Sequence, residues 1–317
     1  MRKRTGTRSP WGAGVLTGVL LLGACGDPGA GDAAPADLPD ASGASAPSGP
    51  SVAPSATTRE RAARDAPDKP SRAPKILYLG DSLAMENQVV LGQQLKSRLG
   101  ARYRSAPYSG TTLCDYLDGT GEDSLVPDKD KAAALVRAQR PDYVVLQFWG
   151  NAWGYTPCMK GITYDKRRAE YLDRYAADAR RLAAQIRGAG GGRTRVVWVL
   201  QGPDPITPDR VRRVNAIYQA QARATGGLVA DAGRTVAPGA DRYTWVEKLP
   251  CTAYERAHPE YCTEPGAGLT ALHREKVDYL HFCLAPTTAK SRPCPVRSPG
   301  IRRMAEAITS RVASDLR

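Results

Sequence analysis

The sequence has no apolar run long enough to cross a membrane as a helix. Its longest, Gly12 to Ala24, falls short of the about 20 residues that such a helix needs. A short apolar run behind a basic start is typical of a signal peptide, and the basic residues here are Arg2, Lys3, Arg4 and Arg8. We therefore predict that residues 1–25 are an export signal.

The signal ends in Leu22-Gly23-Ala24-Cys25, which resembles the bacterial lipobox. In that motif the cysteine is lipidated and becomes the first residue of the mature protein. Two acyl chains hold a protein stably at a membrane, where one does not. The resemblance implies a lipoprotein anchored through Cys25 to the outer face of the bacterial cell membrane. The alternative is an ordinary secretory signal with a chance cysteine.

Residues 26–74 lack aromatic side chains, and Leu38 and Val52 are their only large aliphatic ones. Such a segment cannot bury enough apolar surface to offset the entropy lost on ordering. We predict a disordered tether rich in Ala, Pro, Gly and Ser. Residues 75–317 then form one globular domain, which is a usual length.

Acidic residues are too few to balance the basic ones, and the net charge is +13. The excess is still 9 without the four basic residues of the signal. It could favour anionic membrane or wall polymers, although a solvated arginine-rich surface is the better explanation. Nucleic acid is not expected as a partner, because the arginines are scattered and the protein is exported. Nothing in the sequence suggests an obligate partner, so a monomer is expected.

Six cysteines follow Cys25, and an even number in an exported protein predicts three disulfides. The sequence alone leaves their pairing open. We favour the two short loops, Cys251–Cys262 and Cys283–Cys294, which leaves Cys114–Cys158. A zinc site is the alternative, with ligands among Cys251, His258, Cys262, His281 and Cys283. Their spacing fits no compact ligand pair, so no metal or other cofactor is predicted.

Apolar strands alternate with helical patterns along the domain. The continuous runs Asp142–Phe148 and Arg195–Leu200 are typical of buried parallel strands. Further strands are expected at Lys75–Leu79, Tyr103–Tyr108 and Gly227–Asp231. Helical faces are formed by Val90, Leu91, Leu95 and Leu99; by Leu172, Ala176, Ala179, Ala183 and Ile186; and by Ile301, Ala305, Ile308 and Val312. Thr207-Pro208 and Ser298-Pro299 indicate helix starts.

This alternation predicts an α/β fold, a parallel sheet with helices on both faces and its chemistry at the carboxyl ends of the strands. Gly80-Asp81-Ser82-Leu83 follows the first strand and would place a serine hydroxyl at a helix N-terminus. Gly110 follows the second strand and Asn151 the third. Near the C-terminus, Asp278 precedes His281 by three residues, so the carboxylate can reach the imidazole within one turn.

A nucleophile, a base, a group that orients the base and extra N–H donors are the parts needed for acyl transfer. The other histidines, His258 and His273, have no aspartate three residues before them. Gly-Asp-Ser alone is common turn chemistry. The significance of Ser82 therefore depends on the other blocks being present.

These blocks resemble those of the SGNH hydrolases, also called the GDSL esterase/lipase superfamily. The resemblance runs from Ile76 to about His281, with Ser82 at the nucleophile position, Gly110 and Asn151 at the oxyanion-hole positions, and Asp278 with His281 completing a triad. It implies a flavodoxin-like three-layer α/β/α sandwich with about five parallel strands. It also implies a serine ester hydrolase that forms an acyl-enzyme, with the oxyanion held by the N–H groups of Ser82 and Gly110 and the Asn151 amide.

The sequence departs from the family pattern around Asn151 and after the histidine. Trp149 replaces a glycine, Ala152 an aspartate, and Phe282 a frequent proline. We interpret these changes as marks of a divergent branch. Three aromatic side chains near Asn151 could stack on a sugar ring or simply belong to the core: Trp149, Trp153 and Tyr155.

Three functions fit this pattern. The first is an esterase acting at the cell surface on O-acyl carbohydrate or small lipid esters. The second is an O-acyltransferase of the same fold. The third is a catalytically silent lipoprotein that binds a glycan or a partner protein.

Overall fold

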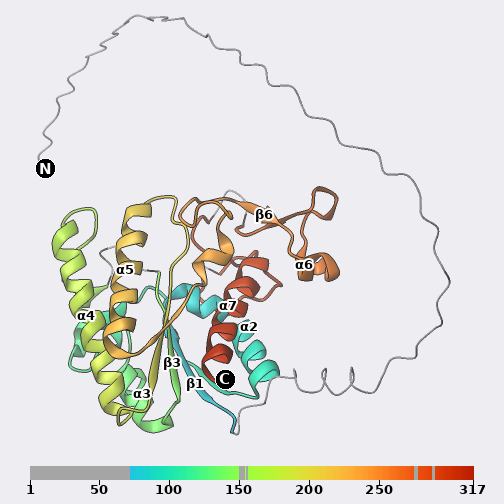
Figure 1. The fold of residues 1–317 in the computed structure, drawn as a ribbon. Coiled ribbons are helices and arrows are strands. Elements are labelled where there is room, and N and C mark those ends of the chain that lie inside the picture. The colour runs from blue at the N-terminus through green and yellow to red at the C-terminus, as the bar shows by residue number, and fades with distance from the viewer. Residues whose placement is uncertain (1–71, 150–153, 155, 275–277, 288–289) are drawn as a thin grey trace, which may run out of the picture. The chain divides into compact units, whose positions relative to one another are not determined.

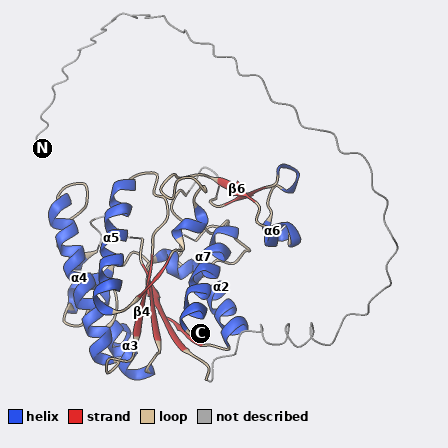
Figure 2. Ribbon diagram, viewed as in Figure 1, coloured by secondary structure: helices blue, strands red, loops and turns tan. Residues whose placement is uncertain are grey.

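The computed structural model describes residues 72–317 except 150–153, 155, 275–277 and 288–289. Five strands form a parallel sheet in the order β2-β1-β3-β4-β5, which is the flavodoxin-like order (Figures 1 and 2). Their bounds are β1 Lys75–Gly80, β2 Arg102–Ser105, β3 Tyr143–Gln147, β4 Arg195–Val199 and β5 Leu228–Ala230. The predicted fold class is confirmed.

Helices cover both faces of this sheet, as a sheet that is apolar on both sides requires (Figure 1). Alternate residues of each strand enter two separate cores. Leu77 and Val144 pack with the helices of one face, and Tyr78 and Val145 with those of the other. The first face carries α3 Ala132–Gln139, α4 Arg168–Ala189 and α5 Pro208–Thr225; the second carries α2 Ser82–Leu99 and α7 Pro299–Asp315. The sandwich therefore has three layers.

The buried face of α4 differs from the predicted one. Leu172 and Ala176 are only partly buried, whereas Tyr171, Tyr175 and Leu182 are fully buried. Tyr171 stacks on Tyr175, whose hydroxyl hydrogen-bonds that of Tyr218 at 2.6 Å. Because the hydroxyls of Tyr175 and Tyr218 satisfy each other, these rings can occupy the core that the smaller residues were expected to fill.

The edge strand β2 ends at Ser105 and is shorter than the predicted strand Tyr103–Tyr108. The N–H groups of Ala106 and Tyr108 still donate to Tyr78 and Gly80, both at 2.9 Å. The chain therefore stays beside β1 as far as the rim of the sheet.

Both predicted helix starts are correct, with Thr207 and Ser298 at the N-cap positions and proline next. Neither side chain makes the capping hydrogen bond. The Thr207 hydroxyl donates to Asp204 at 2.8 Å, and the Ser298 hydroxyl accepts from the Leu284 N–H at 3.0 Å. Both hydroxyls thus bind the segments that precede their helices, and the Thr207 hydroxyl also accepts from the Arg210 side chain of α5 at 3.0 Å.

Between β5 and α7 the chain forms a lobe that the sequence analysis did not anticipate. Its antiparallel strands are β6 Lys248–Pro250 and β7 Leu269–Ala271, with the short helix α6 Ala253–Ala257 between them. The Cys251–Cys262 disulfide closes this lobe, and Cys283–Cys294 closes the loop before α7. These cysteines are therefore oxidised and do not offer the thiolates that the zinc alternative required.

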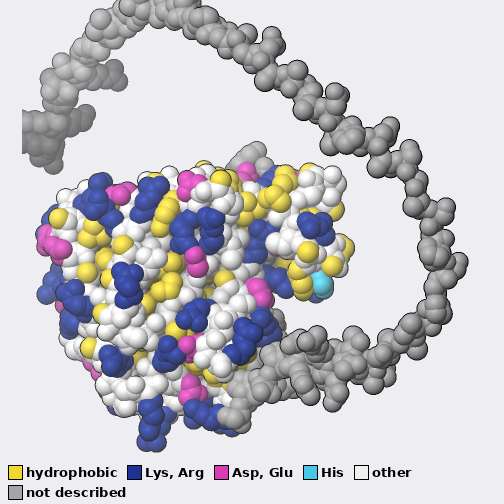
Figure 3. Space-filling model, in the orientation of Figure 1, with side chains coloured by type: hydrophobic (Ala, Val, Ile, Leu, Met, Phe, Trp, Pro, Cys, Tyr) yellow, Lys and Arg dark blue, Asp and Glu magenta, His cyan; other side chains and the backbone are white. Residues whose placement is uncertain are grey.

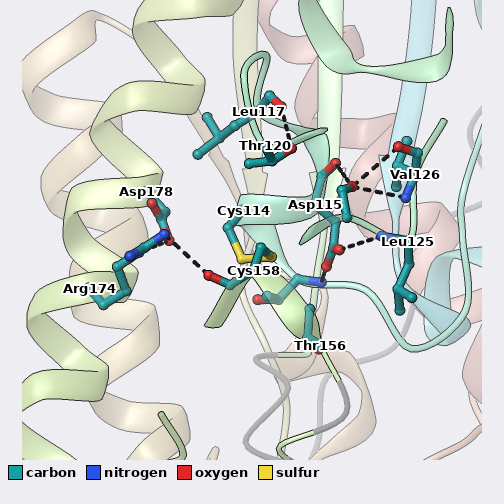
Figure 4. Close-up of a disulfide and its surroundings, with 12 residues drawn as sticks. Cys114, Asp115, Leu117, Thr120, Leu125, Val126, Thr156, Cys158, Arg174 and Asp178 are labelled. Atoms are coloured by element: carbon teal, nitrogen blue, oxygen red, sulfur yellow. Dashed lines mark hydrogen bonds and ion pairs between the residues drawn. A yellow bond between two sulfur atoms is a disulfide. The ribbon is translucent and has the colours of Figure 1, made fainter. Parts of the chain in front are cut away.

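The third disulfide, Cys114–Cys158, joins two short helical turns beside α4 (Figure 4). Arg174 of α4 donates to the carbonyl of Cys158 at 3.2 Å and to the carboxylate of Asp178 at 2.9 Å. All three predicted pairings are thus present.

Lysine and arginine side chains are spread over the face seen in Figure 3, with acidic ones among them. In the parts of the chain that the structure describes, no helix has the length and hydropathy of a membrane span.

Candidate active site

Ser82 lies where β1 turns into α2. Gly80 ends the strand, and a Cβ there would lie 2.0 Å from the carbonyl oxygen of Gln147 on β3, so only glycine fits. Asp81 caps α2 by accepting the N–H of Leu83 at 3.0 Å. Ser82 is the first helical residue, where backbone N–H groups lack partners within the helix. The strand and the cap thus hold the hydroxyl at the rim of the sheet.

His281 and Asp278 lie beside Ser82 although 196 residues or more separate them in sequence. The Nε2 atom of His281 is 2.9 Å from the Ser82 hydroxyl, and its Nδ1 atom is 2.9 Å from an Asp278 carboxylate oxygen. Asp278 also accepts the N–H groups of Leu280 and His281, both at 3.1 Å. These bonds form a tight turn outside any helix and fix the carboxylate against the ring.

The charges in the site favour a protonated imidazole facing an ionised carboxylate. Burial opposes protonation of His281, but the Asp278 hydrogen bond and the charges of Glu86, Asp278 and Asp81 outweigh it, so its pKa is raised. Burial also opposes ionisation of Asp278, yet the hydrogen bond and charge of His281 leave the pKa of that carboxyl lowered. By contrast, burial lowers the pKa of His273 to about 4.

A raised His281 pKa predicts the pH dependence of any reaction that uses the neutral imidazole as a base. Below the pKa the ring already carries its proton, so kcat/KM should fall about tenfold for each pH unit. Because the pKa is raised, the midpoint should lie above about 6.5, the ordinary value for histidine. Measuring kcat/KM for p-nitrophenyl acetate from pH 5 to 9 checks this. A midpoint well below 6.5 would contradict it.

A cavity of about 190 Å³ opens beside Ser82 and His281. Gly110 lines it with φ of +79°, a conformation that favours glycine. The structure thus brings Gly110 to the nucleophile, as predicted from the strand ends. The other lining residues are largely polar: Met85, Glu86, Ser109, Thr287, Ser291 and Arg292.

A larger concavity, of about 560 Å³, lies at the opposite end of the sheet, where β1 begins. Lys75, Lys96, Arg102 and Arg104 are among its lining residues, and the lining contains no serine, cysteine or histidine. Cavity size alone therefore does not identify the chemistry. The smaller cavity is the candidate active site because it contains the nucleophile–base pair.

Trp149 does not present its ring to a substrate. The residue is 6% exposed, and its indole packs edge-on against Phe282, with 5.8 Å between ring centroids. Of the two interpretations, the core one is correct for this residue. Asn151, Trp153 and Tyr155 lie outside the described residues, as does Cys25, so their predicted roles stay predictions.

The main chain of Trp149, in contrast, is tied to the site. Its N–H donates to the Asp81 carboxylate at 2.6 Å, and its carbonyl accepts from Arg210 of α5 at 2.7 Å. Burial raises the pKa of Asp81 to about 6 despite its bonds to the Trp149 and Leu83 N–H groups. Asp81 therefore links the end of β3 to the turn that carries Ser82. The sequence analysis assigned no role to Asp81 or Arg210. Both side chains bind main-chain atoms of Trp149. Because any residue type offers these main-chain atoms, the sequence around Trp149 does not indicate the contacts.

No protein-family model matches this sequence, and no curated protein does. Similar solved structures include the periplasmic domain of a lipopolysaccharide acetyltransferase from Salmonella ser. Paratyphi A (11% identity, 76% of this chain and 84% of that one, TM-score 0.47). Another is a family 3 carbohydrate esterase from Clostridium thermocellum (12% identity, 77% of this chain and 98% of that one, TM-score 0.44). A third is TesA (16% identity, 75% of this chain and 99% of that one, TM-score 0.42). At such identities and TM-scores, activity has to be inferred from the chemistry of the site.

Proposed function

We propose that this protein is a serine ester hydrolase of the SGNH type. The observation that carries the proposal is the continuous chain of short contacts from the Ser82 hydroxyl through His281 to Asp278. Hydroxyl, imidazole and carboxylate in this order form the arrangement that activates a serine for attack on a carbonyl.

In the proposed reaction, His281 takes the hydroxyl proton as Ser82 Oγ bonds to the ester carbonyl carbon. Asp278 holds the Nδ1–H tautomer and stabilises the imidazolium. The N–H groups of Ser82 and Gly110 would donate to the oxyanion, joined by the Asn151 amide if it lies as the sequence predicts. The carbon–alkoxy bond then breaks, and His281 gives its proton to the leaving alcohol. A water activated by His281 releases the acid and restores Ser82.

The cavity favours a short acyl group on a polar alcohol. Its volume, about 190 Å³, is below the roughly 300–1,000 Å³ of pockets that take drug-sized ligands. Its polar lining suits an O-acyl carbohydrate better than a long hydrocarbon chain. With the predicted signal and Cys25 anchor, the enzyme would act at the outer face of the cell membrane.

A fluorophosphonate probe tests the proposed nucleophile without knowledge of the natural substrate. We expect one adduct per chain, located on Ser82 by peptide mass, and none on the Ser82→Ala variant. Ser109→Ala is the matched control, because Ser109 lines the same cavity and has no part in the mechanism. That variant should be labelled as the wild type is. If wild-type protein with intact disulfides gains no adduct, the hydrolase proposal fails. A catalytically silent lipoprotein that binds a glycan or a partner protein then becomes the favoured hypothesis.

Acyl specificity follows from the size of the cavity. We expect kcat/KM for p-nitrophenyl acetate to exceed that for the laurate by more than about tenfold. A single burst of p-nitrophenol, followed by turnover only when a sugar acceptor is added, would identify the O-acyltransferase instead. A preference for laurate would contradict the short-acyl assignment.

A further inference from the structure

Glu86 is an ionisable residue of the candidate site to which the mechanism above assigns no role. It lies on α2 four residues after Ser82, and therefore on the same side of the helix. The residue is 2% exposed, yet it lines the cavity that Ser82 and His281 share. Carboxylates are almost never this deeply buried unless they are paired or hydrogen-bonded.

The partners of Glu86 are in the segment that carries His281. Its carboxylate accepts the N–H groups of Phe282 and Cys283, at 3.2 and 3.3 Å, and the hydroxyl of Thr287. Its main-chain carbonyl accepts the N–H of Cys294 at 3.2 Å. One residue thus holds both ends of the loop closed by the Cys283–Cys294 disulfide against the helix that carries Ser82.

Among the described residues, Glu86 forms no ion pair with a lysine or arginine. Arg292 lines the same cavity, but it is exposed and donates to the carbonyl of Pro286. The cation on which the Glu86 charge acts is protonated His281. Other charged or titratable groups also surround that imidazole: Asp278 from its own turn, Asp81 from the cap of α2, His273 from the segment after β7, and Arg292 across the cavity.

We propose that Glu86 is a positioning residue of this site: its carboxylate fixes the His281 loop on α2, and its charge stabilises the protonated imidazole. This deepens the proposed function. Both parts of the role concern His281 itself, so they can be measured without turnover.

Glu86→Gln separates the charge from the contacts. The glutamine oxygen can accept the Phe282 and Cys283 N–H groups, and its NH₂ can donate to the Thr287 hydroxyl. The hydrogen-bonding pattern is thus kept and the charge removed. Asp115→Asn is the matched control, because Asp115 is also buried and also accepts two main-chain N–H groups, those of Thr112 and Leu125. Unlike Glu86, it is not among the groups whose charges contribute most to the raised pKa of His281.

The experiment is an NMR titration of ¹⁵N-histidine-labelled protein, in which only three histidines give signals. We expect Glu86→Gln to lower the His281 midpoint by about 0.5–1.5 pH units, since a nearby negative charge is lost. Asp115→Asn should leave the midpoint unchanged. An unchanged midpoint in folded Glu86→Gln would overturn the proposal.

Wild-type protein supplies the test if Glu86→Gln does not fold. The ¹³C signal of the Glu86 carboxyl should then shift at the midpoint of His281, and its failure to do so would overturn the proposal as well. In active protein, Glu86→Gln should also move the acid limb of kcat/KM to lower pH by the same amount as the NMR midpoint. A shift by NMR without any turnover would reject the esterase and keep the role of Glu86.

Discussion

Replacing Asp278 with asparagine should lower kcat for ester hydrolysis by about 10⁴-fold and leave the fold intact. The asparagine oxygen can keep the N–H groups of Leu280 and His281, so the turn should survive. Its NH₂ then takes the place of the oxygen 2.9 Å from Nδ1, and because an NH₂ can only donate, Nδ1 has to accept from it. This pairing favours the tautomer with the ring proton on Nε2, the atom 2.9 Å from the Ser82 hydroxyl. In that tautomer His281 cannot take the serine proton. Steady-state kinetics with p-nitrophenyl acetate measures the loss.

Asp241→Asn is the control for this substitution. Asp241 also accepts a main-chain N–H two residues later, from Tyr243 at 2.9 Å, but in an exposed turn. Its variant should retain wild-type kcat, and both variants should unfold near the wild-type temperature. A loss smaller than about tenfold in Asp278→Asn would mean that a different group orients His281.

The sheet could be predicted from the sequence because its signal is local. A strand buried on both faces must be apolar at every position, as in Val144, Val145 and Leu146 of β3. The positions of Ser82 and Gly110 follow from the strands, since Ser82 comes two residues after the end of β1 and Gly110 five residues after the end of β2. The lobe between β5 and α7 has no comparable signal, because β6 and β7 are three residues long and buried only in part.

Contacts between distant segments could be predicted only where the family resemblance or the cysteine count implied them. Trp149 follows a strand as a binding residue would, and only the position of Phe282 shows that its ring is covered. Glu86 could have been suspected, because an acidic residue on the buried side of a helix needs a partner. That this partner is the His281 loop depends on a contact across almost 200 residues. Sequence periodicity reports burial and not the identity of the neighbour.

Asp204→Ala should cost about 3–5 kcal/mol of unfolding free energy, more than any surface substitution. Asp204 and Arg210 form an ion pair whose side chains are 1% and 3% exposed. Burial raises the pKa of Asp204, but the Arg210 charge and the N–H groups of Thr207 and Ile206 outweigh it and leave that pKa lowered. Alanine would remove the counter-charge of a guanidinium that stays buried. Urea unfolding at pH 7 with the disulfides intact measures the cost.

Two further variants show whether the buried charge is the cause. Asp209→Ala removes a half-buried aspartate at the start of α5, where it pairs with Arg213 and accepts the Tyr164 hydroxyl, and should cost about 1 kcal/mol. The double variant Asp204→Ala/Arg210→Met removes both charges and should regain much of the lost stability, because an uncompensated charge costs more than an absent pair. If the double variant is as unstable as Asp204→Ala, the cost lies in the N–H bonds of the 204–207 turn. Recovery would instead show that Arg210 needs Asp204 to stay buried against the Trp149 carbonyl, at the end of the strand beside the nucleophile.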